Sequence, residues 1–275
     1  MGLRDLFDLP GRVAVITGGA GLLGVQHAEA IAEAGGHPVL ADIDEEKAIE
    51  KARIISGKYR VDSIGIRTDI TNKSEVEALL DTILKRFGRV DILINNAAID
   101  PKVEKDTTIN SSRLETFSLN LWNIEIAVGL TGAMLCSKIF GSEMAKRGKG
   151  VILNISSDLG IIAPDQRIYR NKLLPEDQQY VKPVTYSVIK HGLIGLTKYL
   201  ATYWADKGVR VNSISPGGVY TNQDPEFIER LTNLIPLGRM AHEDEYKAAI
   251  IFMVSDASSY MTGANLVIDG GRSCW

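Results

Sequence analysis

The sequence predicts a single α/β domain in which helices cover both faces of a doubly wound parallel sheet. Short apolar segments rich in β-branched residues alternate with helical patterns along the 275 residues. Strands that are apolar at consecutive positions are typical of parallel sheets buried on both faces. The composition, 45% hydrophobic and 24% charged, fits one soluble domain with a large core. We therefore expect one domain over residues 1–275.

Charge and cysteine content narrow the functional classes. The net charge of −3 does not favour a nucleic-acid partner or an anionic membrane surface. The N-terminus carries charges at Arg4 and Asp5, and we expect no stretch to be long and apolar enough to cross a bilayer. We therefore expect a cytoplasmic protein with no membrane partner. Cys136 and Cys274 lack Cys or His neighbours at metal-ligand spacing, so we expect no metal site.

A glycine-rich turn joins the first predicted strand, residues 12–17, to a helical pattern over residues 25–34. Gly19, Gly21 and Gly24 fit the pattern G-x-G-x-x-G. Glycines let the backbone approach a pyrophosphate, and the free N–H groups at the start of the helix attract its charge. A tight turn without a ligand is the alternative. The flanking strand and helix favour a dinucleotide site of the Rossmann type.

Asp42 follows the second predicted strand, residues 37–41, and lies 18 residues after Gly24. A carboxylate at this place accepts hydrogen bonds from ribose hydroxyls and repels a 2′-phosphate, which favours NAD over NADP. The alternative is a solvated or helix-capping aspartate, because Asp44 and two glutamates follow as an acidic first turn.

The remaining elements continue the alternation. Strands are predicted at residues 63–67, 90–94, 150–155, 209–214 and 265–268, and helices at about 73–87 and, with breaks, from a Ser112-x-x-Glu115 capping box to Lys146. Polar residues follow several strands, at the sheet edge where open α/β sheets bind ligands. The strand at 150–155 leads into Ser156, Ser157 and Asp158.

Tyr186 and Lys190 lie four residues apart on the apolar helical pattern of residues 183–200, which places them on one helix face. An adjacent ammonium favours the phenolate, so such a tyrosine can exchange a proton near neutral pH. Taken alone, the spacing also fits a solvated lysine beside a half-buried tyrosine.

Seven motifs in this order resemble the short-chain dehydrogenase/reductase family over nearly the whole chain. They are Thr17-Gly18 through Gly24, Asp69, Asn95-Asn96-Ala97-Ala98, Asn154-Ile155-Ser156-Ser157, Tyr186 through Lys190, Pro216-Gly217 through Thr221, and Asp269-Gly270-Gly271. The resemblance implies a seven-stranded sheet, a NAD or NADP cofactor and a homotetramer built by two long helices. Several segments, including the glycine turn with His27 and Ala28 after it, are similar to those of dehydrogenase-like proteins of bacterial flagellin-modification clusters, which make unusual acidic or amino sugars.

The resemblance also implies roles for individual residues. Tyr186 is expected to exchange the substrate proton, Lys190 to lower the pKa of that phenol and bind the nicotinamide ribose, and Ser157 to donate to the substrate oxygen. Ser156 is the alternative to Ser157. The expected cofactor contacts are Gly18, Gly21, Leu23, Gly24, Asp42, Asp69, Ile70, Asn96, Ala97, Tyr186, Lys190, Pro216, Val219 and Thr221. The expected activity is hydride transfer between NAD(H) and a secondary alcohol or ketone of a sugar or sugar derivative.

Three departures from the family pattern keep other functions open. Leu22 stands where the single-domain branch has glycine, so the turn looks more like that of NAD-retaining nucleotide-sugar epimerases and dehydratases. Gly129 stands where an asparagine usually supports the proton relay, which suggests a catalytically silent nucleotide-binding protein. Chain length, the Asn-Asn-Ala-Ala run and the Pro-Gly segment favour the single-domain dehydrogenases.

The third departure is an insertion over about residues 162–183, because Ser157 and Tyr186 are 29 residues apart instead of roughly a dozen. The inserted segment contains Arg167 and Arg170. We expect it to cover the substrate and its cations to contact a phosphate or carboxylate. A solvated charged loop is the alternative.

Overall fold

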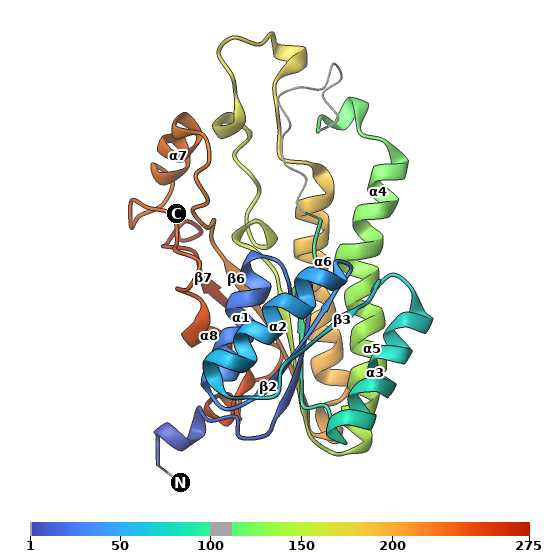
Figure 1. Cartoon of the computed structure of the whole chain (residues 1–275). Coiled ribbons are helices and arrows are strands. Elements are labelled where there is room, and N and C mark those ends of the chain that lie inside the picture. The colour runs from blue at the N-terminus through green and yellow to red at the C-terminus, as the bar shows by residue number, and fades with distance from the viewer. Residues whose placement is uncertain (1, 100–111) are drawn as a thin grey trace.

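The computed structural model describes residues 2–99 and 112–275, and a parallel sheet runs through its centre (Figure 1). The sheet has seven strands in the order β3-β2-β1-β4-β5-β6-β7. These are β1 (Val13–Thr17), β2 (His37–Asp42), β3 (Ile64–Arg67), β4 (Ile92–Asn95), β5 (Gly150–Ile155), β6 (Val209–Pro216) and β7 (Asn265–Ile268). The predicted fold class is confirmed. The strand order reverses between β1 and β4, and ligands bind beyond the strand ends at such a switch point.

Helices cover both faces of the sheet (Figure 1). One face carries α1 (Leu22–Glu33), α2 (Glu45–Tyr59) and α8 (Lys247–Val254). The other carries α3 (Lys73–Phe87), α4 (Leu119–Ile126), α5 (Ala133–Lys146) and α6 (Val184–Tyr203). The short helix α7 (Pro225–Thr232) lies near the C-terminus, beyond the carboxyl ends of the strands.

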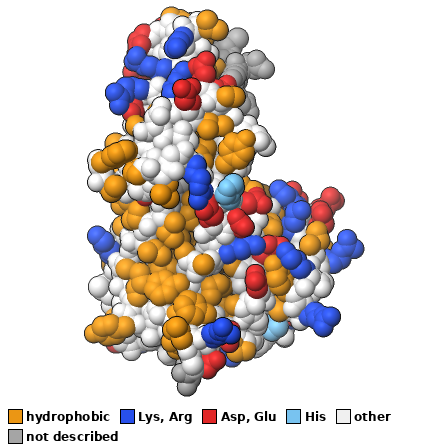
Figure 2. Space-filling view, turned by 90° about the vertical axis from the view of Figure 1, so that its left-hand side faces the viewer, with side chains coloured by type: hydrophobic (Ala, Val, Ile, Leu, Met, Phe, Trp, Pro, Cys, Tyr) orange, Lys and Arg blue, Asp and Glu red, His pale blue; other side chains and the backbone are white. Residues whose placement is uncertain are grey.

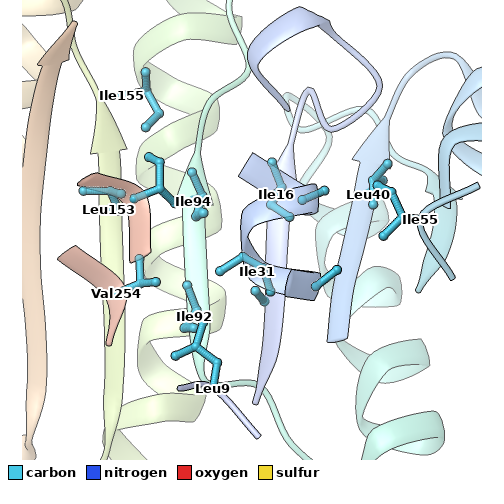
Figure 3. Close-up of a cluster of buried hydrophobic side chains, with 14 of the residues drawn as sticks. Leu9, Ile16, Ile31, Leu40, Ile55, Ile92, Ile94, Leu153, Ile155 and Val254 are labelled. Atoms are coloured by element: carbon cyan, nitrogen blue, oxygen red, sulfur yellow. The ribbon is translucent and has the colours of Figure 1, made fainter. Parts of the chain in front are cut away.

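The core has two layers because neighbouring residues of a strand point to opposite faces of the sheet. Ile16, Leu40, Ile94 and Leu153 point toward the layer that includes Ile31 of α1 (Figure 3). Alternate strand positions, Val13 and Val15 among them, join Phe140 and Met144 of α5 in the second layer. Burial on both faces explains the continuous apolar character of the predicted strands.

The helical region Leu119–Lys146 is long and apolar enough, by length and composition alone, to cross a membrane. The expectation that no stretch of the chain has this property was therefore wrong. In the fold, α5 packs against α3, β4 and β5, and α4 packs against α6. These contacts with the sheet and the neighbouring helices explain why the helical region is so apolar.

The predicted capping box is also wrong. The hydroxyl of Ser112 accepts a hydrogen bond from the N–H of Val181 at 3.3 Å instead of capping a helix. Residues 114–116 form a single 3-10 turn, which ends because Phe117 adopts extended backbone angles. Ser118 is the N-cap of α4, and its Oγ accepts from the N–H of Leu121 at 3.0 Å.

Candidate active site

The glycine turn after β1 is packed too tightly for side chains. A Cβ added at Gly24 would lie 2.2 Å from the carbonyl oxygen of Gly18, and Gly18 itself has a φ of +60°. Gly21 is the N-cap of α1, and no side chain caps this helix. Its first N–H groups, including that of Leu23, therefore face the turn as donors for an anion. The residues present fit the pyrophosphate of a dinucleotide.

Asp42 lies at the end of β2 beside this turn. Its two carboxylate oxygens accept from the N–H of Ala20 at 2.9 Å and the N–H of Asp44 at 3.1 Å. Asp44, and not Asp42, caps α2, because its own carboxylate accepts from the N–H of Lys47 at 3.1 Å. The helix-capping alternative for Asp42 is therefore wrong. Its half-buried carboxylate lies next to the glycine turn, residues 18–24, which we call the nucleotide cradle.

Asn96 and Ala97 tie the end of β4 to the glycine turn. The amide of Asn96 donates to the carbonyl oxygens of Thr17 at 3.0 Å and Gly18 at 3.1 Å. The hydroxyl of Thr17 in turn accepts from the backbone N–H groups of Asn96 and Ala97 at 3.0 and 3.1 Å. These bonds hold together the two strand ends that border the switch point.

The other predicted cofactor contacts also lie at the carboxyl ends of strands. Asp69 follows β3 and accepts from the N–H of Thr71 at 2.9 Å, with Ile70 buried beside it. After β6, the side chain of Gln223 ties down its neighbours, because it donates to the carbonyl of Val219 and accepts from the N–H of Thr221, both at 2.8 Å. Pro216 ends β6 itself.

Lys190 and Tyr186 meet at the end of β5. The ammonium of Lys190 donates to the carbonyl oxygen of Ile155 at 2.9 Å and lies 5.7 Å from the centroid of the Tyr186 ring. Lys190 is 6% exposed, whereas Tyr186 is half-buried. A buried, fixed cation beside a phenol favours the phenolate. The pairing predicted from the four-residue spacing is therefore present.

The two serines after β5 differ in their surroundings. Ser156 is 2% exposed, and its hydroxyl donates to the carbonyl oxygen of Lys190 at 2.8 Å, so it fastens β5 to α6. Ser157 donates to Asp158 Oδ1 at 2.7 Å and accepts from the N–H of Leu159 at 3.2 Å. Ser156 therefore joins β5 to α6, and the contact of Ser157 with a substrate stays a prediction.

Two features near the site were missed by sequence reasoning. Arg272 donates to Asp158 Oδ2 at 2.6 Å although 114 residues separate them. The ammonium of Lys182, in the inserted segment, lies 3.8 Å from the centroid of the Tyr186 ring. The sequence offered one signal for Arg272, namely its place directly after Asp269-Gly270-Gly271.

The inserted segment rises beyond the strand ends between α7 and α4 (Figure 1). Its two arginines are paired with acids of the same segment, Arg167 with Asp165 at 2.6 Å and Arg170 with Glu176 at 2.8 Å. The guanidinium of Arg167 is largely in solvent, since its side chain is 81% exposed. The contact of these cations with a substrate anion stays a prediction.

Gly129 lies in a π-helical turn, Ala127–Gly132, between α4 and α5. A Cβ added at Gly129 would lie 2.8 Å from Cγ2 of Ile189, so the helix carrying Tyr186 packs against this turn too closely for a larger residue. Turns of this kind interrupt the regular helical hydrogen bonds and occur often at functional sites. The expected interruption of the long helix is present although the asparagine is not.

Comparison with known protein families shows where this arrangement belongs. Residues 12–169 match the short chain dehydrogenase family, and residues 176–273 match the family described as enoyl-(acyl carrier protein) reductase. The chain belongs to the short-chain dehydrogenase family. It is therefore an oxidoreductase that uses a nicotinamide cofactor.

Several relatives of this dehydrogenase act on polyols. D-threitol dehydrogenase of Mycolicibacterium smegmatis is 34% identical over 96% of this chain and 94% of its own. NAD-dependent glycerol dehydrogenase of Listeria innocua is 32% identical over 96% and 95%. NADP-dependent mannitol dehydrogenase of Alternaria alternata is 34% identical over 98% and 95%.

A solved structure agrees with these relatives. The gluconate 5-dehydrogenase of Burkholderia cenocepacia, in complex with NADP and tartrate, superposes with a TM-score of 0.86 at 29% identity over all of both chains. The epimerase and the catalytically silent alternatives find no support in these proteins. The finer resemblance to flagellin-modification proteins stays a prediction.

Proposed function

We propose that this short-chain dehydrogenase oxidises a secondary hydroxyl of a polyol or related sugar derivative with NAD, using Tyr186 as general base. The observation that carries the proposal is the contact of Tyr186 with the buried Lys190 at the carboxyl end of β5. The polyol class comes from the relatives, several of which are named for sugar alcohols.

The cofactor would lie along the carboxyl ends of the strands. Gly18, Gly21, Leu23 and Gly24 would hold its pyrophosphate, because the first N–H groups of α1 have no side-chain cap and the close packing of Gly24 on Gly18 fixes the turn before them. Asp42 would bind the ribose hydroxyls and repel a 2′-phosphate, which supports NAD over NADP. The remaining contacts are proposed for Asp69, Ile70, Asn96, Ala97, Pro216, Val219 and Thr221.

In the proposed reaction the substrate loses one hydride and one proton. A bound nicotinamide supplies the hydride acceptor. Tyr186, as phenolate, takes the hydroxyl proton of the substrate, and the carbinol carbon loses its hydride, so that a ketone forms. Lys190 stabilises the phenolate, and Ser157 orients the substrate oxygen. In the reverse direction Tyr186 returns the proton to the alkoxide.

The charges near the site bear on the predicted anionic or amino-sugar substrate. Arg167 and Arg170 are already paired within the inserted segment. Lys182 is the cation of that segment that contacts the catalytic phenol ring. The case for an anionic substrate therefore rests on Lys182 and on the similar gluconate 5-dehydrogenase bound to tartrate, whereas the threitol, glycerol and mannitol dehydrogenases favour a neutral polyol.

We also propose a cytoplasmic location, on the composition of the sequence. We propose a homotetramer because two separate surfaces are apolar. One is the β7 edge, where Figure 2 shows a broad hydrophobic area below a mixed-charge projection and where Leu237, Tyr260 and Val267 are exposed. The other lies on helices α4, α5 and α6, where the exposed apolar side chains are Ile124, Met134, Val188, Tyr199 and Tyr203. Two separate apolar surfaces per subunit suit a dihedral tetramer, in which each subunit contacts its neighbours through more than one interface.

The proposal is tested by following NADH formation with glycerol, D-threitol, mannitol and gluconate, each with NAD and with NADP. We expect turnover of at least one of these polyols and a preference for NAD. Absence of turnover with every substrate and both cofactors, in protein that still binds NADH, would contradict the proposed function.

A further inference from the structure

A buried ion pair joins the C-terminal segment to the serine of the candidate active site. Asp158 and Arg272 are 2% and 7% exposed, and Arg272 Nη1 donates to Asp158 Oδ2 at 2.6 Å. Asp158 Oδ1 accepts from the hydroxyl of Ser157 at 2.7 Å. The contacts therefore run from Arg272 through Asp158 to Ser157. Arg272 and Asp158 have no role in the proposed chemistry described above.

The C-terminal segment is built to deliver Arg272 to this place. Gly270 and Gly271 have φ values of +68° and +90°, a region that favours glycine. The carboxylate of Asp269 accepts from the N–H groups of Gly271 and Ser273, both at 2.9 Å. The turn therefore has a fixed course, and the buried guanidinium is not a solvated surface charge.

The hydrogen bonds of Asp158 fix the direction of the Ser157 hydroxyl. A carboxylate paired with a guanidinium accepts hydrogen bonds and donates none, so the proton in the short contact belongs to Ser157. The N–H of Leu159 donates to both residues, to Ser157 Oγ at 3.2 Å and to Asp158 Oδ1 at 2.8 Å. Oγ is thus held on two sides before any substrate arrives.

We propose that Asp158, held by Arg272, is a positioning residue for Ser157. It fixes the side-chain orientation of Ser157, whose hydroxyl donates to Asp158 Oδ1 in this structure and turns to donate to the substrate oxygen when charge develops there. Burial of the pair is costly unless both partners are present. The role in turnover rests on the proposed function, whereas the effect on the orientation of Ser157 does not.

Asp158→Asn tests the proposal because an amide has one oxygen. It cannot accept from Ser157 and Arg272 with separate oxygens, as the carboxylate does. We expect kcat for polyol oxidation to fall about 10- to 100-fold, as for other residues that orient a reacting group, with the Kd of NADH changed less than about twofold. In a Ser157→Ala background the same substitution should change kcat less than about twofold.

A matched control separates positioning from general destabilisation. Asp256→Asn breaks the ion pair with Arg12, which lies before the amino end of β1 and is also partly buried. We expect it to lower Tm without lowering kcat. An unchanged kcat in Asp158→Asn, or an equal loss with and without Ser157, overturns the proposal. If Asp158→Asn does not fold, Arg272→Lys answers the same question. We expect this variant to lose kcat several-fold, and an unchanged kcat would overturn the proposal.

Crystal structures give a readout that needs no turnover. We expect Ser157 to change its rotamer or lose its bond to residue 158 in Asp158→Asn. An unchanged Ser157 with its hydrogen bonds intact overturns the proposal, whether or not a polyol is oxidised. If the wild type oxidises none of the polyols and Ser157 is nevertheless displaced in the crystal structure of Asp158→Asn, the result counts against the proposed function alone.

Discussion

Ser156 Oγ donates to the backbone carbonyl of Lys190 at 2.8 Å, which fastens the end of β5 to the middle of α6. Gly160 leaves room for this contact, because a Cβ there would lie 2.3 Å from Ser156 Oγ. The same helix carries Tyr186 one turn earlier. The bond therefore sets the place of the catalytic helix relative to the strand that delivers Ser157.

The two serines should differ in their effect on catalysis. Ser156→Ala removes a buried hydrogen bond to a carbonyl inside α6, so we expect a loss of about 0.5–1.5 kcal/mol in the free energy of unfolding with a small effect on kcat. Ser157→Ala removes the hydrogen bond to the buried carboxylate of Asp158, so we expect a loss of about 1.5–3 kcal/mol and, in addition, a fall in kcat of about 100-fold or more. Denaturant unfolding and steady-state kinetics on both variants check this. The opposite pattern would assign the substrate contact to Ser156.

Gly24→Ala should disrupt the nucleotide cradle. The added Cβ would meet the carbonyl oxygen of Gly18 at 2.2 Å, so the turn must move, and we expect NADH binding to weaken about tenfold or more with lower stability. Gly57→Ala is the control, since this exposed glycine of α2 has no atom within 4 Å of the added Cβ. It should raise stability by about 0.5–1 kcal/mol and leave binding unchanged. Equal NADH affinity in both variants would argue against the cradle.

Asp42→Asn should weaken the preference for NAD. Removal of the charge removes the repulsion of a 2′-phosphate. The amide has one oxygen, so we expect it to keep the bond from the N–H of Ala20 and to lose the one from the N–H of Asp44. We expect the ratio of kcat/KM for NAD to that for NADP to fall about tenfold, measured with one polyol. A ratio that does not change would remove Asp42 from cofactor selection.

His27 should make stability depend on pH. Burial lowers its pKa from 6.5 to about 4, and an interaction with Asn96 opposes that shift. The unfolded chain therefore binds a proton near pH 6.5 that the folded protein binds only near pH 4. The free energy of unfolding should fall by about 3 kcal/mol as pH drops from 6.5 to 4. His27→Leu should flatten this part of the profile in urea melts, and an equally steep profile would contradict the assignment.

The fold was predictable because its signals are local. The apolar strand at Gly150–Ile155 and the helix at Lys73–Phe87 each have the bounds that sequence patterns indicate. The Tyr186 and Lys190 pair was predictable for the same reason, since four residues make one helical turn. The error at Ser112 shows the limit, because a capping pattern does not reveal whether the backbone continues as a helix after it.

Contacts between distant parts of the chain were not predictable. Nothing in local spacing joins Arg272 to Asp158, which depends on β5, β6 and β7 lying side by side in the sheet. The same holds for Lys182 on the ring of Tyr186, because the course of the inserted segment is set by tertiary packing. Ser156 and Ser157 look alike in sequence and differ only in what each hydroxyl meets.

The central claim is hydride transfer from a polyol with Tyr186 as the base, and isotope transfer tests it most directly. A polyol that the enzyme turns over is labelled with deuterium on its carbinol carbon, and the label is sought on C4 of the NADH formed. The account predicts full transfer by the wild type, and for Tyr186→Phe a fall in turnover of about 100- to 10,000-fold with NADH binding intact. NADH without deuterium, or a Tyr186→Phe variant that keeps most of its activity, would contradict it.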